Sequence, residues 1–124
     1  MDGVPAFVEI GVPDLEKGRI FYEKLFGWTS TPLPVGTLTL HLGGDNAGAA
    51  REYKIGAGMH PDPDPQIYVY FRVADLDATL ARVVELGGET FPLRPGSPEA
   101  GRYAECRDNQ GVIFGLHEPP SKTS

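Results

Sequence analysis

The amino-acid sequence predicts an α+β domain in which one βαβββ pattern occurs twice, so that two modules form a curved mixed sheet enclosing a cleft. A strand end joined to a helix start occurs at Val12–Leu15 and returns 61 residues later at Val73–Leu76. Each helix is followed by three short segments of β-forming residues bounded by Pro or Gly. One helix covers only one face of four strands, and the other face stays available for a ligand.

The first module is predicted from alternation and helix capping. Apolar residues occupy every second position of its first strand, at Val8, Ile10 and Val12. Asp14 is a favourable N-cap and Gly27 a stop signal, so we expect a helix over residues 14–26. The packed face of this helix would carry Leu15, Phe21, Tyr22 and Leu25. The three following strands are expected at Trp28–Leu33, Thr37–Leu42 and Glu52–Ala57.

The second module repeats this order. Its first strand is predicted at Ile67–Val73, and Asp75 caps a helix that ends at Gly87. The apolar face of the helix is expected at Leu76, Leu80, Val83 and Val84. The three following strands are expected at Thr90–Leu93, Tyr103–Arg107 and Val112–His117. Turn-forming residues at 108–111 join the last two strands as a hairpin.

A proline-rich segment separates the modules. Residues 59–65 carry proline at every second position from Pro61, so we predict a stiff connector that is neither helix nor central strand, with a solvated His60. The predicted organisation is one domain over residues 1–124, with modules at about 5–58 and 66–118 and a flexible tail at 119–124.

Composition limits the classes of function. The formal charge is −6 and the basic residues are scattered, which argues against a nucleic-acid partner. No apolar run is long enough for a membrane span, and the N-terminus lacks the pattern of a signal peptide, so we expect no membrane partner and a cytoplasmic location. Cys106 is the one cysteine, which excludes an internal disulfide.

The repeated strand–helix starts resemble those of the vicinal oxygen chelate superfamily, which includes glyoxalases, bleomycin-resistance proteins, fosfomycin-resistance enzymes and extradiol dioxygenases. The resemblance also rests on Phe21–Trp28, Leu86–Gly88 and Arg107–Leu116, and it extends from about residue 5 to residue 118. It implies a glyoxalase/bleomycin-resistance-like fold with a small-molecule site in the cleft. It also implies a homodimer.

Metal-dependent members of that superfamily bind a divalent ion through side chains on the first and fourth strands of each module. The resemblance places these positions at Phe7, Tyr68, Gly115 and one residue within 52–56, where only Glu52 is an ordinary ligand. We therefore expect no metal and no other cofactor, and hence a metal-free, ligand-binding protein. Whether it is an enzyme of the lyase, isomerase or dioxygenase type stays open.

Strand alternation indicates which side chains line the cleft. The predicted ligand-binding residues are Phe7, Glu9, His41, Tyr68, Tyr70, Arg72, Ile113, Gly115 and His117. An aromatic wall with one acid and one guanidinium suits a planar or amphipathic organic molecule.

Several alternatives accompany this prediction. Phe7 and Tyr68 are equally explained as core aromatics, and Glu9 with Arg72 as a structural ion pair. If Glu9 is buried without a partner, it becomes the candidate catalytic base. A displaced divalent-metal site made of Glu9, His41 and His117 would indicate a lyase or dioxygenase. A dimerising interaction module without a ligand is the third alternative.

Overall fold

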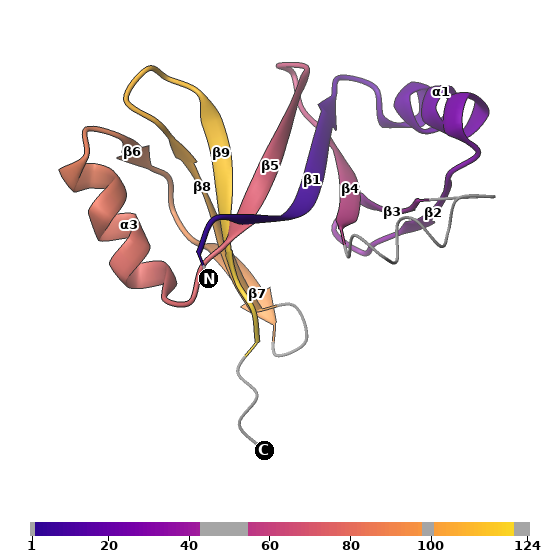
Figure 1. The fold of residues 1–124 in the computed structure, drawn as a ribbon. Helices are drawn as coiled ribbons and strands as arrows, with labels where there is room; N and C mark the ends of the chain where they lie inside the picture. The colour runs from indigo at the N-terminus through magenta and orange to yellow at the C-terminus, as the bar shows by residue number, and fades with distance from the viewer. Residues whose placement is uncertain (1, 43–54, 98–100, 121–124) are drawn as a thin grey trace. The chain divides into compact units, whose positions relative to one another are not determined.

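The computed structural model describes residues 2–42, 55–97 and 101–120, which form two compact units (Figure 1). We call Phe7–Tyr68 the first module, and Met1–Ala6 with Val69–Ser124 the second module. That the two modules form one domain stays a prediction.

The first module has the predicted βαβββ order. Its strands form a sheet in the order β2-β3-β4-β1, in which β1 and β4 are parallel and the other neighbours antiparallel. A parallel pair cannot be joined by a tight turn, and α1 with the two intervening strands makes the connection. The elements are β1 (Val4–Val12), α1 (Leu15–Phe26), β2 (Thr29–Pro32), β3 (Leu38–His41) and β4 (Gly56–Pro61).

The second module repeats this topology and adds one further strand, β7. Its sheet has the order β6-β8-β9-β5, with β5 and β9 parallel, and β7 also pairs with β8. The predicted α+β fold with a duplicated βαβββ pattern is confirmed. The elements are β5 (Gln66–Arg72), α3 (Leu76–Glu85), β6 (Glu89–Thr90), β7 (Arg94–Ser97), β8 (Gly101–Arg107) and β9 (Ile113–Glu118).

Both helices begin at the predicted caps. The carboxylates of Asp14 and Asp75 each accept a hydrogen bond from the backbone N–H three residues later, at 3.0 Å in both cases. Gly27 ends α1 in a left-handed conformation with φ 76°, which a residue without a Cβ adopts at no steric cost. No helix in the described part of the chain is long and apolar enough to cross a bilayer.

Each module has its own hydrophobic core on the helix-covered face of its sheet. The first contains the buried residues Ile10, Leu38, Leu40, Ala57 and Met59. The second contains Val73, Leu76, Ala104, Cys106 and Leu116. The predicted inward face of the first strand, with Val8, Ile10 and Val12, is confirmed. Cys106 is fully buried, and this burial raises the pKa of its thiol to about 11, as expected for an inert core residue.

The helix faces depart from the prediction. In α1, Leu15 and Tyr22 pack on the core, whereas Phe21 and Leu25 are 59% and 57% exposed. Val84 of α3 is likewise 58% exposed. Apolar spacing alone assigned these residues to the core, but each helix turns only one narrow stripe toward its sheet.

Three strand predictions also need correction. β4 continues to Pro61 and pairs with both β1 and β3, so residues 59–61 belong to a central strand rather than to a connector. Pro61 is tolerated because it is the last residue of β4. The predicted strand at 90–93 is displaced to β6, and β7 occupies residues expected to be loop. Residues 52–54 of the predicted fourth strand, and 121–124 of the predicted tail, lie outside the described residues.

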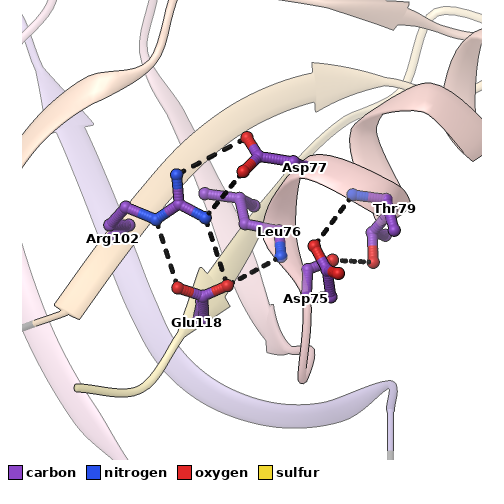
Figure 2. Close-up of polar contacts among 7 residues, drawn as sticks. Asp75, Leu76, Asp77, Thr79, Arg102 and Glu118 are labelled. Atoms are coloured by element: carbon purple, nitrogen blue, oxygen red, sulfur yellow. Dashed lines mark hydrogen bonds and ion pairs between the residues drawn. The ribbon is translucent and has the colours of Figure 1, made fainter. Parts of the chain in front are cut away.

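A network of charged groups ties the start of α3 to β8 and β9 (Figure 2). The Glu118 carboxylate accepts the Leu76 N–H at 2.9 Å and the Arg102 Nε–H at 3.1 Å. Arg102 also donates to Asp77 at 3.1 Å. The adjacent Arg102 guanidinium lowers the pKa of Glu118, so Glu118 stays ionised and complements the positive N-terminal end of the helix.

Residues 2 and 3 also belong to the second module, where they contact the segment between β5 and α3. The Gly3 N–H donates to the Arg72 carbonyl at 2.8 Å, and the Ala74 N–H donates to the Asp2 carboxylate at 3.0 Å. These contacts fix residues 2 and 3 beside the segment that joins β5 to α3.

Candidate functional site

The first module pairs Glu9 with a histidine that sequence reasoning placed in solvent. Glu9 on β1 and His60 on β4 meet through Oε2 and Nδ1 at 2.6 Å. Their side chains are 15% and 17% exposed. Glu9 thus has a partner, so the condition under which it would become the candidate catalytic base is not met, and a catalytic role for Glu9 stays a prediction. The predicted solvated His60 is wrong, because β4 carries it into the sheet.

Glycines make room for this pair and for Phe7. Gly56 and Gly58 lie opposite Phe7 and Glu9 in the parallel β1–β4 register. A Cβ at Gly58 would stand 2.8 Å from Glu9 Oε1 and 3.2 Å from Phe7 Cζ. A Cβ at Gly56 would stand 2.9 Å from the Phe7 ring. The Phe7 ring therefore lies over the backbone of Gly56 and Gly58, and Glu9 Oε1 lies over that of Gly58.

The second imidazole nitrogen of His60, Nε2, also has a carboxylate partner. Nε2 lies 3.3 Å from Asp62 Oδ2, which also accepts a hydrogen bond from Gln66 Nε2 at 3.0 Å. The hydrogen bond to Glu9 is the main cause that raises the pKa of His60, and Asp62 adds to it. The Tyr68 ring meets the imidazole edge to face at a centroid distance of 6.2 Å. The structure thus groups Glu9, His60, Asp62, Gln66 and Tyr68.

The second module carries a different polar pair at the corresponding place. The Tyr70 hydroxyl on β5 donates to the Glu105 carboxylate on β8, and both residues are buried. The Tyr70 ring lies over Gly115, where a Cβ would stand 2.2 Å from it. Tyr103 meets the same ring edge to face at 5.8 Å.

A repeated Gly-x-His motif on the last strand of each module underlies both arrangements. Gly58 and His60 on β4 recur as Gly115 and His117 on β9, at the same spacing. Register places Gly58 opposite Glu9 and Gly115 opposite Tyr70. Sequence reasoning missed His60, Asp62, Gln66 and Glu105, and this internal repeat is the signal that would have found His60.

The remaining predicted residues lie on the expected strands. His41 on β3 hydrogen-bonds Thr31 through Nε2 at 2.7 Å, and is exposed. Arg72 and His117 are opposite each other in the β5–β9 pair, and Ile113 is half-buried at the start of β9. Whether any of these side chains contacts a ligand stays a prediction.

Two of the four positions that the resemblance assigns to metal ligands have no ligating side chain. Phe7 has no donor atom, and at Gly115 the Tyr70 ring fills the space that a ligating side chain would need. Glu52 lies outside the described residues. Two residues of the alternative metal site predicted from Glu9, His41 and His117 have separate partners: Glu9 pairs with His60, and His41 pairs with Thr31. Among the residues that the structure describes, no three His, Cys, Asp or Glu side chains gather into a metal-binding group.

Comparison with known proteins identifies relatives across most of the chain. The anthracycline biosynthesis protein DnrV of Streptomyces peucetius is 33% identical over 127 residues, covering 92% of this chain and 46% of DnrV. The glyoxylase-like protein CFP32 of Mycobacterium tuberculosis is 33% identical over 113 residues, covering 86% of this chain and 40% of CFP32. The chain spans less than half the length of these relatives. No protein-family model matches it.

Solved structures share the fold at low sequence identity. Methylmalonyl-CoA epimerase from Mycobacterium tuberculosis superimposes with a TM-score of 0.63 at 22% identity, over 97% of this chain and 89% of the epimerase. A Streptomyces coelicolor methylmalonyl-CoA epimerase in complex with 2-nitronate-propionyl-CoA gives 0.65 at 16% identity, over 98% and 100%. The chain therefore has the glyoxalase-like fold of these structures, with the duplicated βαβββ topology, and over most of its length it is similar in sequence to DnrV and CFP32.

Proposed function

We propose that this protein binds a small planar or amphipathic organic molecule, and that the first module contacts it through Phe7, Glu9 and Tyr68. The observation that carries the proposal is that the Phe7 ring and Glu9 Oε1 lie together over Gly58. An aromatic face beside a carboxylate oxygen offers stacking and a hydrogen-bond acceptor to the same ligand.

The relatives support the aromatic character of the ligand. DnrV and DauV are named as anthracycline biosynthesis proteins, and anthracyclines contain a fused, planar ring system. A planar ligand loses little conformational entropy on binding, which favours recognition by rigid strands. The other residues of the proposed ligand set are His41, Tyr70, Arg72, Ile113, Gly115 and His117.

A binding screen tests this proposal. Thermal unfolding would be measured with fused-ring quinones and naphthols, and with flexible aliphatic acids of similar size as the comparison. We expect the planar compounds to raise the melting temperature in a saturable way, because they bind the native state. Phe7→Ala should weaken this effect, whereas Phe71→Ala, on another strand, is the matched control.

Metal dependence is tested in the same assay. Binding should be unchanged after treatment with a chelator, because Phe7 and Gly115 offer no ligand atoms from their side chains. Loss of binding on chelation, restored by a divalent ion, would contradict the proposal and favour the metal-dependent enzyme. Absence of binding by every planar compound would also contradict it.

We further infer a homodimer. Helix α1 exposes the apolar residues Phe21, Leu25 and Phe26 by 59%, 57% and 52%, and this cluster is one that a second copy would cover. Light scattering after size-exclusion chromatography should give about twice the mass of one chain, and Phe21→Asp should reduce it to the mass of the monomer.

A further inference from the structure

We propose that Glu9 Oε1 recognises a hydroxyl or ammonium donor on the planar ligand, and that His60 is the positioning residue that holds Glu9 for this contact. This inference rests on the proposed function, since it names the chemical group that the same site selects. It assigns different tasks to the two carboxylate oxygens.

The two oxygens of Glu9 have different surroundings. Oε2 is held by His60 Nδ1 at 2.6 Å. Within the described part of the chain, His60 is the side-chain hydrogen-bond partner of Glu9. Oε1 lies over the bare backbone of Gly58, beside the tip of the Phe7 ring. Because each carboxylate oxygen accepts about two hydrogen bonds, Oε1 can still accept a donor from a ligand that stacks on Phe7.

The groups behind His60 fix its orientation. Asp62 faces Nε2 of His60 at 3.3 Å and is itself anchored by the Gln66 side chain and by the Asp64 N–H at 2.9 Å. A protonated imidazole donates from both nitrogens, and so it satisfies both carboxylates at once. The series Gln66, Asp62, His60 and Glu9 therefore sets the direction in which Oε1 points.

The combined charge of Glu9, His60 and Asp62 selects the class of ligand. The titratable groups that face His60 are Glu9 from β1, Asp62 after β4, and the Tyr68 ring from β5. With His60 protonated, two carboxylates and one imidazolium leave a net negative charge. A neutral hydroxyl or an ammonium group is therefore attracted, and a ligand carboxylate or phosphate at this point is repelled.

A matched pair of probes tests the inference. 2-Naphthol and 2-methoxynaphthalene share one ring system, but only the first has a donor. We expect the wild type to bind 2-naphthol about tenfold to a hundredfold more tightly by fluorescence titration, as for a hydrogen bond to a charged group. Glu9→Gln should remove most of that preference by weakening 2-naphthol binding. Glu85→Gln, at an exposed position of α3, is the matched control and should retain the preference.

The positioning role of His60 has its own measurement. The preference for 2-naphthol should decline as the pH rises through the raised pKa of His60. The neutral imidazole has one N–H only, so it can no longer donate to both Glu9 and Asp62 and holds Glu9 less firmly. His60→Gln should lower the preference and remove this pH dependence. An unchanged pH profile in His60→Gln would overturn the role given to His60. Circular dichroism of each variant, with Glu9→Asp as a second substitution, identifies any loss of folding.

The possible failures are distinct. If neither naphthalene probe binds the wild type, the proposed function fails and the inference fails with it. If both bind equally well and Glu9→Gln changes neither affinity, the donor inference is overturned while the proposed function stands.

Discussion

The Tyr70 ring occupies the space in which a side chain at residue 115 would stand, so Gly115→Ala should destabilise the protein. The added Cβ would lie 2.2–2.5 Å from three ring carbons, against an ordinary contact distance of about 3.5–4.0 Å. The ring must move, and the hydrogen bond from Tyr70 to the buried Glu105 is then lost. Overpacking costs about 1–3 kcal/mol and the lost hydrogen bond about 0.5–1.5 kcal/mol, giving a loss of roughly 1.5–4.5 kcal/mol.

A double-mutant cycle isolates this contact. In a Tyr70→Ala background, Gly115→Ala has no ring to displace. Gly115 is not among the glycines with positive φ, so alanine there should stabilise by about 0.4–1 kcal/mol through the unfolded state. The free energy of unfolding would be measured by urea denaturation of all four proteins. An equal cost of Gly115→Ala in both backgrounds would refute the placement of the ring over Gly115.

Three further perturbations test other parts of the structure. The Glu9 carboxylate raises the pKa of His60 above its usual 6.5, so the stabilisation from His60 is fully present below about pH 6.5 and is lost as the pH rises through the raised value. The difference in unfolding free energy between wild type and His60→Gln, from urea titrations at several pH values, should shrink with rising pH, and a constant difference would contradict this. Asp75→Ala removes the N-cap of α3 and should cost about 1 kcal/mol in the same assay; no cost would mean that the cap contributes nothing. Glu118→Gln weakens the contacts with the Leu76 N–H and Arg102, so the melting temperature should fall, with an unchanged value counting against the network.

The helices were predictable because their signals are local. Asp14 and Asp75 each cap a helix through the backbone N–H three residues later, a contact that depends on a few neighbouring residues only. The duplicated topology was predictable for the same reason, since both copies repeat the strand end and cap. The faces of the helices were less predictable, because whether Phe21 or Tyr22 packs depends on the angle at which α1 meets the sheet.

The candidate site was less predictable because it depends on pairing between distant strands. The prolines at 61, 63 and 65 suggested a loop, whereas β4 pairs with β3 as far as Met59 and with β1 as far as Pro61. That error removed His60 from the sheet, and with it the partner of Glu9. Which residue of β4 lies opposite Glu9 is set by register, which strand alternation alone does not determine.

The contacts of Asp2 and Gly3 give these two residues an influence far from their own sequence neighbours. They bind Ala74 and Arg72, so the second module has its complete set of contacts at the entry to α3 only when residues 2 and 3 are in place. A substitution at Asp2 would therefore disturb the approach to α3 before it disturbed the strand β1 that immediately follows.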